Sequence, residues 1–136
     1  MADQLTEKII AAAIEVHKTL GSGLLESIYE EALCFELSSM EVAFQRQMAA
    51  DVLYKGHVIH GQRLDLLVES EVVVEVKSLR TLPEVATAQL LSYLKATGLK
   101  RGLLLNFGEK QMISGIKRIS LCSLWLVFGL NLRFPC

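Results

Sequence analysis

The feature that most constrains this chain is an apolar run that ends in two charges. Residues 72–78 read VVVEVKS, and the β-branched residues predict a buried strand. Because side chains alternate along a strand, Glu75 and Lys77 share one face, opposite the alternate valines. Glu and Lys are rarely fully buried unless they are paired. The charged end of this strand therefore needs either a partner or a function.

Asp65 lies in the preceding predicted strand, residues 63–68, with a turn expected near residues 69–70. A tight hairpin would bring its carboxylate close to that of Glu75. Two carboxylates with a nearby lysine are what a divalent cation and a phosphodiester require. Two interpretations stay open: a catalytic site, and a structural ion pair or solvated strand end.

The remaining segments predict an α/β fold around one mixed sheet. Helical periodicity covers two segments before residue 40, and a third helix follows Pro83 and ends before Gly98. The predicted strands are residues 42–54, 57–68, 71–78 and 101–107, with a turn at residues 55–56. The helix between the last two strands makes a crossover long enough to pair them in parallel.

Gln89 and Tyr93 lie four residues apart, so they share one face of the third helix. This helix directly follows the strand that carries Glu75 and Lys77, so we expect it to pack beside that strand. An amide and a phenol can orient a water molecule or a phosphate oxygen. A surface amide and a core tyrosine are the alternative interpretations.

Composition limits the class of protein. The chain has 136 residues, 51% of them apolar and 21% charged, with a net charge of −1, which predicts one globular domain. Residues 1–40 carry seven acidic and two basic residues, whereas residues 41–118 carry eight acidic and eleven basic ones. The candidate site thus lies in a mildly basic segment, which permits a polyanionic substrate. Three cysteines without a C-x-x-C spacing, and no signal sequence, favour a reducing cytoplasm.

Residues 121–136 form a strongly apolar tail. It is short and interrupted by Gly129 and Arg133, so we expect no transmembrane segment. We expect a domain over residues 1–120, with residues 121–136 as an apolar C-terminal extension of it. One or two additional strands, or a subunit contact, would suit this tail, which leaves a homodimer open.

Several separated motifs resemble the GxxExxY proteins, a family within the PD-(D/E)XK nuclease-like superfamily. Residues 23–29 read GLLESIY, and residues 89–99 and 105–108 continue the likeness, as do residues 117–119. The resemblance covers roughly residues 5–120. It implies a restriction-endonuclease-like fold with an α-β-β-β-α-β core and a mixed central sheet flanked by helices.

The resemblance also implies roles for individual residues. Asp65 matches the first acidic position of the superfamily, although Leu64 precedes it where the pattern has proline, and residues 75–77 match the (D/E)-x-K motif. Asp65, Glu75 and the Val76 carbonyl would hold Mg²⁺ or Mn²⁺, and Glu26 would join them directly or through water. Lys77 would position the attacking water. Gln89 and Tyr93, which resemble a Q-x-x-x-Y motif, would orient the water, the lysine or the phosphate.

Together these features predict a Mg²⁺-dependent nuclease that hydrolyses phosphodiester bonds in DNA or RNA. The near-neutral charge and small size favour a second interpretation, a non-catalytic nucleic-acid-binding or protein-interaction module on the same scaffold. Hydrolysis of a small phosphorylated metabolite is a third and weaker interpretation.

Overall fold

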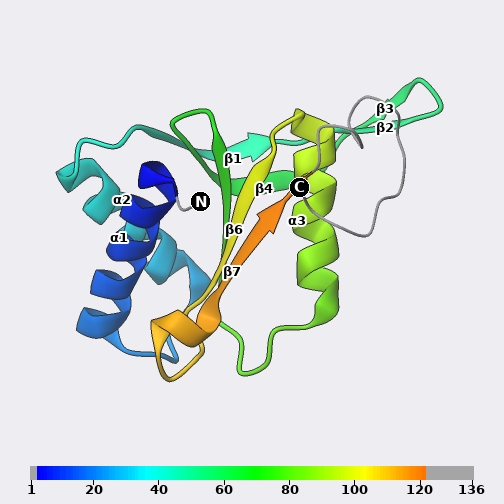
Figure 1. Ribbon diagram of the computed structural model, residues 1–136. Coiled ribbons are helices and arrows are strands. Elements are labelled where there is room, and N and C mark those ends of the chain that lie inside the picture. Colours follow the sequence, from blue (N-terminus) through cyan, green and yellow to red (C-terminus); the bar gives the residue numbers. More distant parts are fainter. Residues whose placement is uncertain (1–2, 122–136) are drawn as a thin grey trace.

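The computed structural model describes residues 3–121, which form one mixed sheet with helices on both faces (Figure 1). In chain order the elements are α1 (Gln4–Leu20), α2 (Glu26–Ser39), β1 (Phe44–Ala49), β2 (Val52–Tyr54), β3 (His57–Ile59), β4 (Arg63–Val68), β5 (Val72–Lys77), α3 (Glu84–Thr97), β6 (Arg101–Asn106), the 3₁₀ helix η1 (Met112–Gly115) and β7 (Ile116–Ser120). The five strands of the main sheet lie in the order β1-β4-β5-β6-β7. This arrangement is the predicted restriction-endonuclease-like fold.

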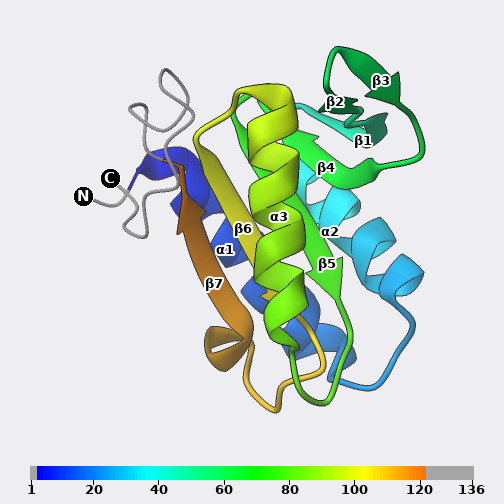
Figure 2. The same cartoon turned by 90° about the vertical axis from the view of Figure 1, so that its right-hand side faces the viewer.

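Helices α1 and α2 cover one face of the sheet, and α3 covers the other (Figure 2). The Asp3 side chain caps α1 by accepting a hydrogen bond from the Thr6 amide at 2.7 Å, as expected of an N-cap aspartate. Helix α3 ends at Gly98, whose φ of 75° provides the left-handed turn that favours glycine. The crossover through α3 leaves β5 and β6 parallel, as predicted, while the other neighbouring strands of this sheet pair antiparallel.

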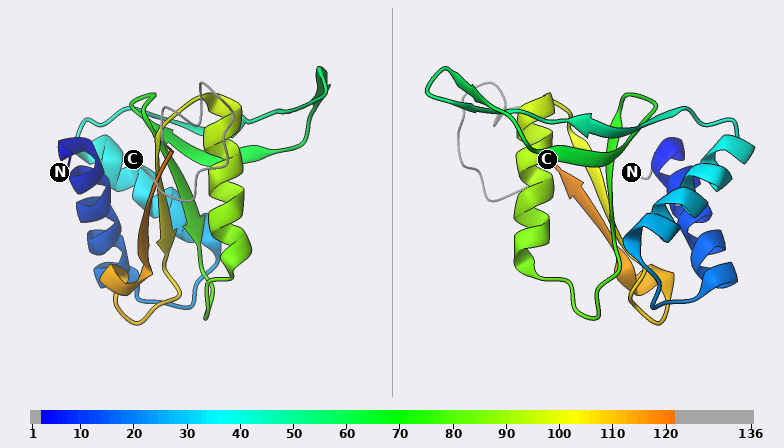
Figure 3. Two further views of the ribbon diagram at one scale, coloured as in Figure 1. Left: turned by 45° about the vertical axis from the view of Figure 1, so that its right-hand side comes forward. Right: turned by 180° about the vertical axis from the view of Figure 1, so that it is seen from behind.

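Two of the predicted strands are each divided in two. The segment 42–54 becomes β1 and β2, and the segment 57–68 becomes β3 and β4. Their outer parts pair only with each other and form a separate two-stranded sheet that projects beyond α3 (Figure 3). The turn expected at Lys55 and Gly56 is present, and both residues have positive φ, of 49° and 79°.

The sheet separates two apolar cores. The core under α1 and α2 takes the valines of β5 at 72, 74 and 76, and the core under α3 takes Val73. The alternation predicted for this strand is therefore confirmed. Strand β7, at the sheet edge beside β6, was not predicted, and the expected strands or subunit contact of residues 122–136 lie outside the described residues. Within residues 3–121, no helix is long and apolar enough to cross a membrane.

Candidate active site

The candidate site lies where the backbone pairing between β4 and β5 stops. The ladder runs through Leu66 opposite Val74, and the next pair in the same register would be Asp65 and Glu75. Their carboxylates replace the missing strand–strand bonds. The Asp65 amide donates to Oε1 of Glu75 at 2.9 Å, and the Val76 amide donates to Oδ2 of Asp65 at 2.8 Å. The fold thus places two carboxylates side by side at an opening between two strands.

Glu75 is the buried member of this pair, with 3% of its surface exposed. Burial, followed by the neighbouring Asp65 carboxylate, raises the pKa of its carboxyl to about 8, although the Asp65 amide and Lys77 act in the opposite direction. A buried acid whose charge lacks compensation binds a proton or a cation. Such a perturbed carboxyl marks a candidate functional site.

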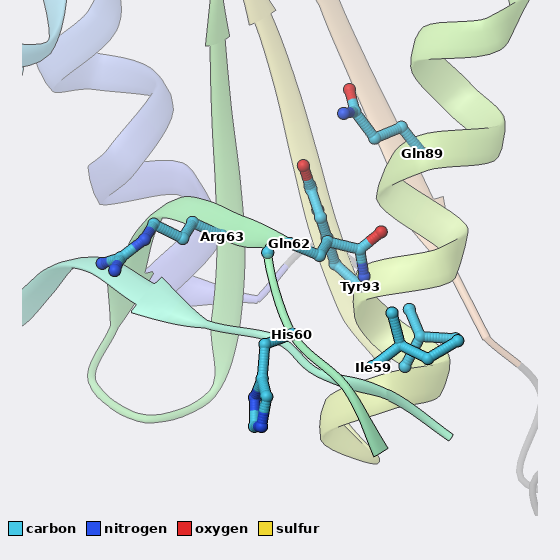
Figure 4. Close-up of a pocket in the computed structure, with 8 residues that line it drawn as sticks. Ile59, His60, Gln62, Arg63, Gln89 and Tyr93 are labelled. Carbon is cyan, nitrogen blue, oxygen red and sulfur yellow. The ribbon is translucent and has the colours of Figure 1, made fainter. Parts of the chain in front are cut away.

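Helix α3 provides the polar groups that face the pair. Nζ of Lys77 donates to Oε1 of Gln89 at 3.4 Å, so the helix holds the lysine at the end of β5. Gln89 and Tyr93 both extend from α3 toward the strands (Figure 4). Burial raises the pKa of the Tyr93 phenol to about 12, with smaller contributions from Glu75 and Asp65, so the phenol stays protonated and can donate.

The strand next to Asp65 is distorted at the same level. Gln47 on β1 stands opposite Asp65 in the register, but its φ is 54°, a conformation rare for a non-glycine residue inside a strand. The face alternation also shifts here: Leu64 packs in the core under α3, whereas Leu66, two residues on, packs in the core under α1 and α2. A local irregularity of this kind redirects side chains next to active sites.

A model of the PD-(D/E)XK nuclease superfamily matches residues 3–119. The chain belongs to this superfamily. The searches of curated proteins and of solved structures found no match. The match spans every element that builds the site, from α1 to β7. Membership of the GxxExxY family within the superfamily stays a prediction.

The superfamily site of this chain has neighbours that sequence reasoning missed. Glu30 on α2 is 8% exposed, and Arg46 binds its Oε2 through Nε at 3.0 Å and Nη2 at 2.8 Å. The Gln47 amide nitrogen lies 3.1 Å from Oε1 of Glu30 and 3.5 Å from Oδ1 of Asp65. Gln47 therefore links the helix carboxylate to the site carboxylate. The only sequence signal was three consecutive long polar side chains, at 45–47, inside an otherwise β-prone segment.

Glu26, the helix carboxylate named by the resemblance, lies elsewhere. It is exposed and lines a groove of about 410 Å³ with Leu24, Leu25 and Ser78. The Ser78 hydroxyl donates to the Leu24 carbonyl at 2.6 Å, which ties the end of β5 to the start of α2. The Tyr29 hydroxyl donates to the Gly21 carbonyl and accepts from the Leu24 amide, so it stabilises the turn before α2. The role of Glu26 as a ligand stays a prediction, as does that of the Val76 carbonyl.

The donor chemistry of Asp65 and Glu75 can be compared with what a divalent cation needs. Among residues 3–121 no group of three or more His, Cys, Asp or Glu side chains is placed to hold one ion. Mg²⁺ needs only one or two carboxylates and keeps several waters. Asp65 and Glu75 supply two carboxylates. A bound cation would also compensate the charge of the buried Glu75 carboxylate.

Proposed function

We propose that this protein is a Mg²⁺-dependent nuclease that hydrolyses phosphodiester bonds in DNA or RNA. The observation that carries the proposal is the opposed Asp65 and Glu75 pair, with Glu75 buried and Lys77 beside it on the same strand. A structural ion pair would not need a second carboxylate against a buried glutamate, because like charges at close range oppose ionisation. Membership of the nuclease superfamily supports the same conclusion.

The bound ion, Mg²⁺ or Mn²⁺, would polarise the phosphate and lower the pKa of a bound water. Asp65 and Glu75 would hold it. Lys77, kept in place by Gln89, would position the attacking water and offset the charge that develops on the phosphate. Tyr93 would donate a hydrogen bond to a phosphate oxygen, since its raised pKa keeps it protonated.

A nuclease panel tests this proposal. Single- and double-stranded DNA and RNA are incubated with the full chain in Mg²⁺ or in EDTA. We expect cleavage in Mg²⁺ that Lys77→Ala reduces roughly 100- to 1,000-fold, the range seen when one donor to a developing negative charge is removed. Lys8→Ala, an exposed lysine on α1, is the matched control and should cleave like wild type. Cleavage that persists in Lys77→Ala would reveal a contaminating nuclease.

A second function has one specific observation in its favour. Among residues 3–121 no three carboxylates are placed to hold one ion, whereas the resemblance implied three. A non-catalytic nucleic-acid-binding or protein-interaction module would tolerate that loss. Nucleic-acid binding that is tight, unaffected by EDTA and never followed by cleavage would favour this alternative.

A further inference from the structure

The β2–β3 hairpin and its two connections to the main sheet form an arm, residues 50–62, with an unusual surface. All six residues of β2 and β3 are exposed, although most of them are apolar or aromatic. Leu53 is 71% exposed and Tyr54 57% exposed. Apolar side chains displayed on both faces of a two-stranded sheet do not stabilise the fold, so they are available to a ligand.

The base of the arm is fixed in place. The Ala50 amide donates to the Gln62 carbonyl at 2.8 Å, and the Gln62 side-chain amide donates to the Ala50 carbonyl at 3.0 Å. Ser92 on α3 donates to Oε1 of Gln62 at 3.3 Å. These bonds join the two strands to each other and to α3. The arm is therefore held at one position relative to the candidate active site.

A cavity of about 480 Å³ lies between the base of the arm and α3 (Figure 4). Val52 and Ile59 line it from the arm, and Gln89 and Tyr93 line it from α3. Its volume is in the range of small-molecule sites and too small for a double helix. Gln89, which lines the cavity, also accepts a hydrogen bond from Lys77, so the cavity is adjacent to one of the candidate catalytic residues.

Two cations, one at the tip of the arm and one directly after its base, suit a polyanion. Lys55 stands at the tip, with its Nζ 5.4 Å from the centre of the Tyr54 ring, and His60 and Arg63 lie on the rim of the cavity. His60 pairs with Asp51, the single acidic residue of the arm, at 3.1 Å. An exposed aromatic ring beside cations is the combination that binds the bases and phosphates of a single strand.

We propose that the arm binds a single-stranded segment of the nucleic-acid substrate, with one nucleotide in the cavity beside Tyr93 and a following base on Tyr54. This inference rests on the proposed nuclease function and adds a substrate class to it. The cations at the tip and rim favour nucleic acid over an apolar protein partner, since a protein partner would be served by the aliphatic residues alone.

Fluorescence anisotropy with a fluorescein-labelled oligothymidylate and its oligouridylate counterpart, in EDTA at low salt, measures binding by the full chain. We expect Tyr54→Ala to weaken affinity by about fivefold or more, the loss typical of one base–aromatic stack. Lys55→Ala should weaken affinity and reduce the slope of log K against log salt by about 0.7. A duplex of the same length should bind less tightly than the single strand.

Matched controls lie on the opposite side of the sheet: Phe35→Ala, an aromatic residue of α2 that is 70% exposed, and Lys8→Ala on α1. Both should bind like wild type, and circular dichroism checks that every variant is folded. Oligonucleotide binding by Tyr54→Ala and Lys55→Ala that equals wild type would overturn the inference. So would arm variants that convert a dimer to a monomer in sedimentation while oligonucleotide binding is unchanged, because the arm would then be a contact between chains.

Hydrolysis of bis(p-nitrophenyl) phosphate in Mg²⁺ separates this inference from the proposed function, since that substrate is too small to reach the arm. Tyr54→Ala should hydrolyse it like wild type. Loss of this hydrolysis in Tyr54→Ala would overturn the inference by placing Tyr54 in the catalytic machinery. A wild type that hydrolyses neither this diester nor any nucleic acid would contradict the proposed function. If wild type is active but the arm variants bind the oligonucleotides as tightly as wild type does, only the inference about the arm is contradicted.

Discussion

The two faces of the central sheet differ in what they bury. Under α1 and α2 most buried side chains are apolar, including the three alternate valines of β5, and the buried carboxylate of Glu30 on α2 is neutralised by Arg46. Under α3 the apolar core reaches only part of the sheet, and the same strand presents Glu75 and Lys77 beyond it. One strand thus supplies a stabilising face and a polar face. The comparison teaches that the buried carboxylate on one face, Glu30, has an arginine as its ion-pair partner, whereas Glu75 on the other face has no ion pair among residues 3–121.

The apolar face should give the largest effect on stability. Leu105 on β6 is fully buried in the core under α1 and α2. Leu105→Ala should lower the free energy of unfolding by about 2–5 kcal/mol, through lost apolar burial and a residual cavity. Urea denaturation measures this change, with the exposed Leu53→Ala as the control expected to change little. Equal losses in both variants would contradict the claim that burial under α1 and α2 is what stabilises the fold.

On the polar face, replacement of the buried Glu75 carboxyl should raise the free energy of unfolding instead of lowering it, and the size of this gain should depend on pH. Because the pKa of Glu75 is about 8 when folded and its ordinary value is 4.5, the folded state holds a proton between these pH values that the unfolded state has released. In the absence of metal, the contribution of Glu75 to stability should therefore fall as pH rises from about 4.5 to 8. The contribution is fully present below that window and lost above it.

Glu75→Gln removes this titration while it keeps the size of the side chain. Urea denaturation from acid to alkaline pH should show a flatter profile for the variant, and the variant should be more stable than wild type at pH 8. Parallel profiles for the two proteins would show that Glu75 ionises normally. The same variant should lose Mg²⁺-dependent cleavage, so stability and activity would change in opposite directions.

The distortion at Gln47 should give the smallest stability effect. Gln47→Gly relieves its positive φ, so we expect a gain in stability of no more than about 1 kcal/mol. Gln45→Gly on the same strand is the matched control and should destabilise by about 0.5–1 kcal/mol, since its φ is ordinary.

Cleavage should separate these two glycine variants further. Gln47→Gly removes the amide that joins Glu30 to Asp65, so its cleavage rate should fall, whereas Gln45→Gly should retain wild-type cleavage. Equal rates for both would show that the amide bridge does not position Asp65. Steady-state kinetics on an oligonucleotide measures the difference.

The parts of the fold that follow local rules could be predicted from the sequence. The alternation of side chains along β5 predicted which of them face each core. Gly98 predicted the end of α3, and Lys55 with Gly56 predicted the turn between β2 and β3, because both places need a positive φ. The spacing of Asp65 and Glu75 was enough to place their carboxylates together, because a hairpin is a local structure.

The missed features depend on tertiary structure. The shift of face at Leu64 and Leu66 arises from an irregular backbone opposite Gln47, which no alternation pattern encodes. Glu30 joins the site only because β1 folds back onto α2, and the arm separates because its residues find no partner strand in the main sheet. The role of Glu26 rested on resemblance and stays a prediction, with this residue lining a groove beside Ser78.

Isothermal titration calorimetry with Mn²⁺ tests the central claim most directly, that the opposed carboxylates of the polar face bind a divalent cation. We predict that wild type binds the ion, that Asp65→Ala loses this binding, and that Asp51→Ala, an acidic residue of the arm, retains it. Equal binding by wild type and Asp65→Ala, or no binding by wild type, would contradict the account.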